Sequence, residues 1–260
     1  MPKNFTAGYN IFFAALVCVF WSILVSASAV SLKDRQEANK QFDKQRNILF
    51  ATGLVKPDED MSREGMIKKY EEKIRPYVIE LKSGEVQKDM EPASFDQRFA
   101  SSDASQSTKA PDNAAKVARL PNNALVYHVV DGEKVESVVV PVKGMGLWST
   151  MYGYLALDAD TTTILGVAFY EHGETPGLGG EISNPKWTAK WEKRKIFNEQ
   201  FEPVFTVKKG GAGTVADDPH NVDAITGATL TSNGVTNTIQ FWLGESGYGP
   251  YLKRFREGGR

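Results

Sequence analysis

The first pattern along the chain is an uninterrupted apolar run near the N-terminus. Residues 11–30, IFFAALVCVFWSILVSASAV, contain no charged side chain. A helix of this length, rising about 1.5 Å per residue, spans about 30 Å, the thickness of a bilayer hydrocarbon core. The run therefore predicts a membrane-spanning helix. A cleaved signal peptide is the alternative, since Lys3 precedes the run and 27–29 read Ala-Ser-Ala. The length of the run and the polar helical segment after it favour a retained anchor.

Three polar segments follow the apolar run. Residues 31–54 are rich in Lys, Gln, Glu and Ala, which predicts a continuation of the helix as far as Gly53. Residues 60–81 predict a short amphipathic helix stopped by Pro76, with one apolar stripe made of Met66, Ile67, Tyr70 and Ile74. Residues 83–123 are rich in Ser, Asp, Ala and Lys, which predicts a linker with some helix.

From residue 124 onward the pattern changes to short apolar runs of strand length. ALVYHVV and VESVVVPV flank an Asp131-Gly132 turn and predict a β-hairpin. Residues 152–172 predict a second pair of strands, and 203–209 predict a further short strand. These runs together indicate an antiparallel sheet.

Two helices are expected within the same region. Asn184 as N-cap and Pro185 at the first helical position predict a helix over 184–197. A second helix, ended by Gly244, is predicted by Val235, Ile239 and Trp242 at helical spacing. The expected fold class is α+β: a single N-terminal transmembrane helix, then an antiparallel sheet packed with helices. The expected divisions are a membrane anchor at 1–31, a helical and linker region at 32–123 and a folded domain at 124–260.

Composition and charge narrow the possible chemistry. The 31 basic and 32 acidic residues give a net charge of −1, which provides no general attraction for nucleic acid. With 3 His and 1 Cys, a Cys/His zinc site and a disulfide framework are excluded, and no metal site is expected. Redox chemistry would therefore require a bound cofactor. Charges on the two sides of the apolar run leave its orientation in the membrane ambiguous.

Two glycine-rich loops, at 142–154 and 170–183, are candidates for contact with a ligand. Glycine lets the backbone approach a ligand closely or adopt positive φ, and the second loop contains Gly177, Gly179 and Gly180. This loop does not fit the G-x-G-x-x-G pattern and precedes no βαβ unit, which argues against a Rossmann nucleotide site. Glu174 and His172 would suit a general acid/base pair, but no nucleophile lies nearby in the sequence, so a hydrolase is disfavoured.

The stretch 222–235, VDAITGATLTSNGV, places several hydroxyls at the start of the last predicted helix. A helix N-terminus favours phosphate, because its backbone N–H groups are unpaired and the dipole is positive there. Thr231 and Ser232 are expected to cap this helix near such a phosphate. Capping does not explain why five further residues stand together before them, namely Asp223, Thr226, Gly227, Ala228 and Thr229.

The same stretch resembles D-x-x-[ST]-G-A-T, the motif at which bacterial flavin transferases attach FMN to a threonine. In this chain the motif reads, in order, Asp223, Ala224, Ile225, Thr226, Gly227, Ala228 and Thr229. The resemblance implies that Thr229 accepts the cofactor through a phosphoester. It extends over nearly the whole chain: the anchor, GLWSTMY, ETPGLGGE, TGATLTSNGV and FWLGESGYGPYL are similar, in that order, to the C-subunit family of the sodium-translocating NADH:quinone oxidoreductase.

This resemblance implies a covalent-FMN, electron-carrying subunit of an inner-membrane complex that oxidises NADH, reduces ubiquinone and pumps sodium ions out of the cytoplasm. The implied partners are the other members of the six-subunit complex, A to F, a flavin transferase and membrane lipid, and the C-terminal domain would be periplasmic. The residues expected to position the flavin are Glu174, Thr175, Leu178 and Gly179, with Leu147 and Trp148 as secondary candidates. The G component of the Rnf electron-transport complex, which shares the FMN-binding domain, and a non-redox scaffold subunit remain alternatives.

Overall fold

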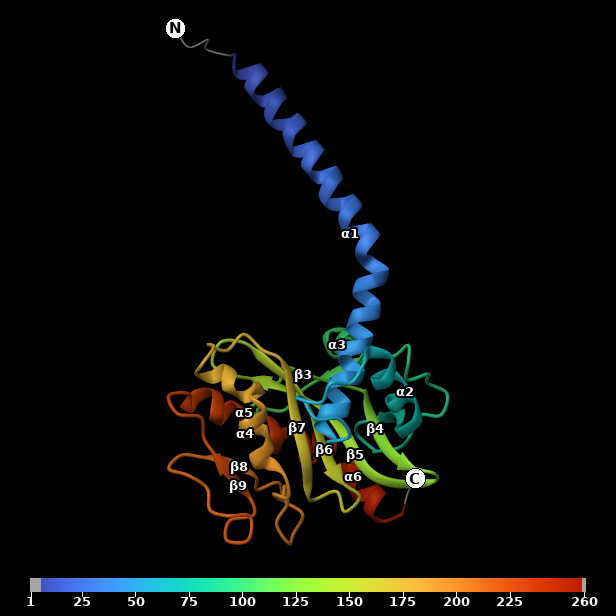
Figure 1. Cartoon of the computed structure of the whole chain (residues 1–260), viewed down its shortest axis with the longest axis vertical. Coiled ribbons are helices and arrows are strands. Elements are labelled where there is room, and N and C mark those ends of the chain that lie inside the picture. The colour runs from blue at the N-terminus through green and yellow to red at the C-terminus, as the bar shows by residue number, and fades with distance from the viewer. Residues whose placement is uncertain (1–5, 259–260) are drawn as a thin grey trace. The chain divides into compact units, whose positions relative to one another are not determined.

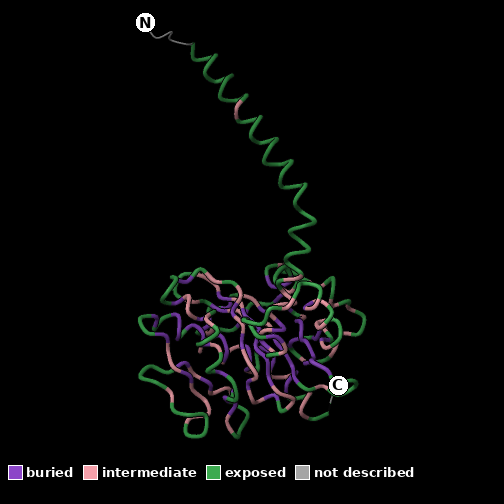
Figure 2. Tube along the Cα trace, viewed as in Figure 1, coloured by how far each residue is buried: buried purple, intermediate pink, exposed green. Residues whose placement is uncertain are grey.

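The computed structural model describes residues 6–258 and divides into two compact units after Lys44. The first unit is formed by helix α1 (Ala7–Ala51), whose last residues, from Gln45, belong to the second unit. The most apolar part of α1 has a mean hydropathy of 2.3 and no buried residues (Figure 2). A helix this long with apolar side chains exposed on all sides fits a single-pass membrane anchor, as the sequence predicts.

The second unit is built on a five-stranded antiparallel sheet (Figure 1). The strands follow the order β1 (Ile74–Glu80), β4 (Asn123–Asp131), β5 (Lys134–Met145), β6 (Thr150–Asp158) and β7 (Ile164–Glu171). Both predicted hairpins are confirmed as β4–β5 and β6–β7, and Gly132 in the first turn has φ of 61°. The α+β fold class is therefore confirmed.

Helix α5 (Thr229–Leu243) packs along β5 and buries Val235, Ile239 and Trp242 against the core. The contact requires a glycine in the strand, because a Cβ on Gly144 would lie 1.9 Å from the Thr238 hydroxyl oxygen. The helix ends at Gly244 as predicted. A further helix, α6 (Gly249–Arg256), follows it and was not expected from the sequence.

Short elements complete the unit. They are α3 (Gln97–Ser102), the antiparallel pair β2 (Ser107–Lys109) and β3 (Arg119–Pro121), the 3₁₀ helices η1 (Gly179–Ser183) and η2 (Ala189–Trp191), α4 (Pro185–Thr188), and the parallel pair β8 (Thr206–Lys208) and β9 (Asn221–Asp223). Asn184 caps α4 as predicted, by accepting a hydrogen bond from the Lys186 N–H. Helix α4 ends at Thr188, whereas the sequence predicts a helix as far as residue 197. The residues that follow α4 include Trp191, Ile196 and Phe197, which pack into the main core without forming a continuous helix.

The prediction for 60–81 is half wrong. Helix α2 (Arg63–Lys73) forms at its start, but Ile74 begins strand β1 rather than closing a helical stripe. Pro76 lies inside this strand, opposite Tyr127. A proline cannot donate to a sheet ladder, and it is tolerated here because β1 is an edge strand. The cross-strand pairing with β4 outweighs the local helical pattern.

Residues 83–123 are not a linker. They contain α3, β2 and β3, and four of their apolar residues join the main hydrophobic core: Ala110, Ala115, Val117 and Leu120. The Leu125 N–H also donates to the Gln97 side chain, which fixes α3 against β4. The core positions of this segment could not be predicted from its polar composition, because they are isolated small or apolar residues without helical or strand periodicity.

Candidate functional site

The carboxylate of Glu174 joins both glycine-rich loops to the start of α5. It accepts hydrogen bonds from the backbone N–H groups of Leu147 (3.1 Å), Trp148 (2.9 Å) and Ser149 (3.3 Å) in the loop between β5 and β6. It also accepts a 2.5 Å hydrogen bond from the hydroxyl of Thr231 in α5. Glu174 is only 5% exposed. One buried side chain therefore holds three segments that are far apart in the sequence.

The surroundings of Glu174 keep it ionised. Burial raises the pKa of this carboxyl, but the hydrogen bonds from Thr231 and from the loop N–H groups outweigh burial and leave the pKa below its ordinary value. An anionic, fully engaged carboxylate is a structural anchor and a poor general acid. The pairing of Glu174 with His172 is limited to a hydrogen bond from the Glu174 backbone N–H to the His172 Nδ1. The carboxylate does not take part in it, so an acid/base pair is not formed.

The glycines of the two loops leave room for the Glu174 network. A Cβ on Gly179 would lie 2.6 Å from the Thr231 hydroxyl oxygen and 2.9 Å from Glu174 Oε2. A Cβ on Gly146 would lie 2.5 Å from Glu174 Oε1. These distances are too short for a side chain, so Gly146 and Gly179 are explained by contacts inside the protein. No ligand is needed to explain why glycine occurs at these two positions.

Helix α5 starts differently from the prediction. It begins at Thr229, and its N-cap is Ala228, which has no side chain able to accept a hydrogen bond. The expected caps, Thr231 and Ser232, are 1% exposed and lie inside the first turn. Thr231 donates to Glu174, and the Ser232 hydroxyl accepts from the Ile225 N–H at 3.2 Å. The capping prediction was wrong because both hydroxyls turn inward and bond to segments outside the helix.

The flavinylation-type motif separates into an exposed part and a structural part. Thr226, Gly227 and Thr229 are exposed, whereas Ala228 is buried. Gly227 has φ of 77°, and a Cβ there would lie 2.9 Å from the Leu178 side chain. The loop at Leu178 therefore touches the turn that leads into α5, and glycine suits this turn because its φ is positive.

Asp223 has a different environment from the rest of the motif. Its carboxylate forms an ion pair with Lys190 at 2.6 Å and accepts from the Ala212 N–H at 2.6 Å. The bond from Lys190 and the one from Ala212 lower the pKa of Asp223. Its backbone carbonyl accepts from the indole of Trp187. Asp223 therefore fixes the chain at β9 against neighbouring loops.

Large apolar side chains stand exposed around the Glu174 network. Trp148 is 65% exposed, and Leu147 and Leu178 are 42% and 44% exposed. Leu230, beside Thr229 at the start of α5, is 60% exposed. Thr175 contributes through its backbone, since its carbonyl accepts from the Leu178 and Gly180 N–H groups. Leu230 is not among the residues predicted from the sequence, where its signal is an apolar residue between the hydroxyls of Thr229 and Thr231 on the first helical turn.

Comparison with known proteins identifies the family. A sequence model described as the FMN-binding domain matches residues 146–244, which include both Glu174 and Thr229. The C subunit of the Na(+)-translocating NADH-quinone reductase of Yersinia pestis is 43% identical over 260 residues, covering 98% of this chain and 96% of the relative. The protein of the same name from Pseudomonas aeruginosa is 39% identical over 248 residues, covering 94% of each chain.

Solved structures agree with the sequence relatives. The crystal structure of Shewanella oneidensis NqrC is 34% identical, with a TM-score of 0.78 over 85% of this chain and 99% of that one. The reductase C subunit from Parabacteroides distasonis is 28% identical, with a TM-score of 0.65 over 85% of this chain and 96% of that one. With near-complete coverage by relatives above 30% identity, the chain belongs to the C-subunit family of the Na⁺-translocating NADH-quinone reductase and contains an FMN-binding domain.

Proposed function

We propose that this chain carries FMN covalently, through a phosphoester to the hydroxyl of Thr229, and passes electrons within a sodium-translocating complex that oxidises NADH and reduces ubiquinone. The observation that carries the proposal is the position of Thr229: an exposed hydroxyl on the first residue of a 15-residue helix whose N-cap supplies no side-chain acceptor. The match to the Yersinia pestis relative over nearly the whole chain supports the redox role.

The start of α5 suits a phosphate. The first N–H groups of a helix have no partner within the helix, and the dipole is positive there. At α5 they receive no side-chain cap from any residue between 6 and 258. Thr229 is an exposed residue that follows the Gly227 turn, so a flavin transferase would be able to reach it. A phosphate attached there would lie where the helix favours negative charge.

The exposed apolar residues suit the flavin ring. Leu147, Trp148, Leu178 and Leu230 offer apolar surface beside the helix start, and several large apolar side chains exposed together are typical of a binding surface. FMN would supply the redox chemistry, while these residues would orient its ring and exclude water from one side of it. Glu174 would act as a positioning residue, since it holds Leu147, Trp148 and Thr231 without being exposed itself.

The remaining parts of the proposal concern placement and partners. The second unit is proposed to lie on the periplasmic side of the inner membrane, with α1 in the bilayer, and to contact other members of the six-subunit complex. A flavin transferase would attach the cofactor during maturation. The name of the Yersinia pestis relative, a subunit of the reductase, supports contact with other subunits, and the single apolar helix supports the anchor.

The proposal is tested by the intact mass of the chain purified from its native membrane under denaturing conditions. We expect a mass increased by that of FMN less one water, with fragmentation assigning the addition to Thr229. An unmodified chain, or FMN that is lost on denaturation, would refute the covalent attachment. An addition on Thr226 would preserve the flavoprotein assignment and change the acceptor.

A further inference from the structure

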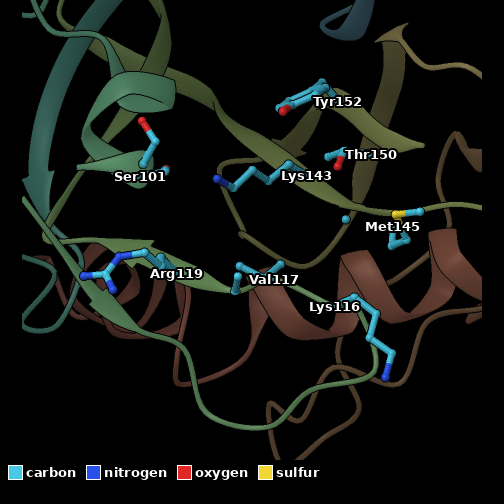
Figure 3. Close-up of a pocket in the computed structure, with 11 residues that line it drawn as sticks. Ser101, Lys116, Val117, Arg119, Lys143, Met145, Thr150 and Tyr152 are labelled. Atoms are coloured by element: carbon cyan, nitrogen blue, oxygen red, sulfur yellow. The ribbon is translucent and has the colours of Figure 1, made fainter. Parts of the chain in front are cut away.

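A cavity of about 300 Å³ opens beside the β5–β6 hairpin, and none of the apolar residues proposed to face the flavin lines it (Figure 3). Lys143 in β5 alternates with Val142, which belongs to the main core, and with Gly144, which lies against α5. Its side chain therefore projects from the opposite face of the sheet. The other polar residues that line the cavity come from separate segments: Ser101, Ser102, Lys116, Arg119, Thr150 and Tyr152.

The lining of this cavity is positively charged. It includes Lys116, Arg119 and Lys143, and no Asp or Glu is among the described residues that line it. Figure 3 shows the Lys143 side chain extending across the middle of the site, whereas the Lys116 ammonium points away from it. The cavity is therefore a place where positive charge gathers around Lys143.

Lys143 has no counter-ion in the structure. Within residues 6–258 its ammonium group makes no ion pair and no hydrogen bond. Burial and the nearby positive charge of Arg98 both lower the pKa of Lys143. Keeping a half-buried ammonium charged without a partner costs free energy, and an anion bound in the cavity would offset that cost.

The neighbouring acids are engaged elsewhere. Glu171 forms an ion pair with Arg98 at 2.8 Å. Asp103 accepts hydrogen bonds from Ser105 and Gln106 and does not line the cavity. The Arg119 guanidinium donates to neutral acceptors, the carbonyls of Ala104 and Ser107 and the Ser107 hydroxyl, and the nearby Asp103 carboxylate partly compensates its charge, which leaves Lys143 as the main cation of the cavity.

We propose that this cavity binds a phosphate-type oxyanion, with the Lys143 ammonium as its main ligand. The hydroxyls of Thr150 and Tyr152 have no hydrogen-bond partner in the described structure and provide neutral donors beside Lys143. Ser101 and Ser102 on α3 line the cavity from a different segment, but their hydroxyls already donate to the carbonyls of Gln97 and Phe99. The available donors are therefore the Lys143 ammonium and the hydroxyls of Thr150 and Tyr152, which an anion with several oxygen atoms can engage together.

The site is independent of the flavin assignment. It lies at the base of the 146–149 loop, where Met145 pairs with Thr150, and uses none of the residues that would hold FMN. Its experimental test is therefore distinct from that of Thr229. Binding of inorganic phosphate to the full-length chain in detergent would be measured by isothermal titration calorimetry, in a buffer free of other oxyanions.

We expect saturable phosphate binding by the wild-type chain and a loss of affinity of about tenfold or more in Lys143→Met, because one charged hydrogen-bond partner is removed. Lys143→Arg keeps the charge and should retain binding, and Lys134→Met, which changes an exposed lysine of the same strand outside the cavity, is the matched control that should leave it unchanged. Unaltered binding in Lys143→Met, an equal loss in Lys134→Met, or no saturable binding by the wild-type chain would overturn the proposal.

A second experiment identifies the source of the oxyanion. Phosphatidylglycerol vesicles would be added to the phosphate-loaded chain, with phosphatidylcholine vesicles as the neutral control. Displacement of phosphate by the anionic vesicles in the wild-type chain, absent with the neutral ones, would assign the site to a lipid headgroup. Retention of phosphate in both mixtures would assign it to a soluble anion. The thermal midpoints of all variants, measured without phosphate, would show that they are folded.

Discussion

The hydroxyl of Thr231 donates a 2.5 Å hydrogen bond to the carboxylate of Glu174, which lies 57 residues earlier in the chain. This contact connects the start of α5 to the loop after β7, and through the same carboxylate to the loop at 147–149. The three segments carry both the proposed FMN acceptor and the apolar residues proposed to face the flavin. The relationship between Thr231 and Glu174 therefore determines how the parts of the site are placed relative to one another.

Replacing Glu174 by Gln should destabilise the folded domain by about 1–3 kcal/mol, because an amide of the same shape cannot accept all four of its hydrogen bonds. Urea unfolding of the full chain in detergent, followed by tryptophan fluorescence, would measure the change. The exposed Glu192→Gln is the control, for which we expect about 0.5 kcal/mol or less. Equal stabilities of the two variants would contradict the anchoring role.

The contribution of Glu174 should depend on pH. Its folded-state pKa lies below the ordinary value of 4.5, so the stability that it provides is fully present above about pH 4.5 and is lost as the pH falls toward the folded-state pKa. Several Asp carboxyls with lowered pKa values add their own pH dependence, so the relevant quantity is the difference between wild type and Glu174→Gln. That difference in unfolding free energy should shrink on acidification. A constant difference between pH 7 and the acid range would show that the carboxylate charge is not involved.

A methyl group on Gly179 should disturb the same network. Its carbon would lie 2.6 Å from the Thr231 hydroxyl oxygen, so Gly179→Ala requires the helix start or the loop to move. We expect a loss of about 1–3 kcal/mol. The neighbouring Gly180→Ala, whose closest contact would be 3.2 Å, should cost less. If flavin is bound as proposed, its absorbance should also change more in the Gly179 variant, and the reverse order in both measurements would refute this account.

Covalent flavin should depend on Thr229 and not on its neighbouring hydroxyls. Thr229→Val keeps the side-chain shape and removes the acceptor, so the protein band should lack flavin fluorescence after coexpression with the transferase and denaturing electrophoresis. Thr226→Val, which changes an exposed hydroxyl in the same turn, is the matched control and should remain fluorescent. Fluorescence in the Thr229→Val band would show that another residue is the acceptor.

Thr231→Val separates positioning from attachment. It removes the hydroxyl bonded to Glu174, and leaving a buried carboxylate with one fewer donor should cost about 1–3 kcal/mol. Attachment should persist, because the Thr229 hydroxyl is untouched. Urea unfolding and gel fluorescence of the same preparation would report both effects. A folded variant without covalent flavin would place Thr231 in the attachment step itself.

The periplasmic placement of the second unit is open to direct labelling. Glu133, at the exposed tip of the β4–β5 turn, is a suitable site for Glu133→Cys in a Cys18→Ala background, since Cys18 is the single native cysteine. An impermeant thiol reagent should label this variant in cells whose outer membrane has been permeabilised. Labelling that requires rupture of the inner membrane would place the domain in the cytoplasm.

The pattern of residues along the chain was sufficient to predict those elements that form through contacts between residues close together in the sequence. The apolar run predicted α1, and the Asp131-Gly132 sequence predicted the β4–β5 hairpin because a short turn brings the two flanking strands side by side. The hydroxyl of Thr229 stands out in the sequence because it belongs to a short motif. These features need no knowledge of what lies across the molecule.

Contacts between residues far apart in the sequence determined strand β1 and the start of α5. Ile74 and Pro76 continue a helical pattern in the sequence, yet pairing with β4 makes them an edge strand. Thr231 and Ser232 look like helix caps, but the positions of Glu174 and Ile225 turn them inward and leave Ala228 as the N-cap. The sequence by itself determined the anchor, the sheet hairpins and the motif, since those depend on neighbouring residues. Only the tertiary structure decided the role of Glu174, because its hydrogen bonds to Leu147 and Thr231 exist only once separate segments are brought together.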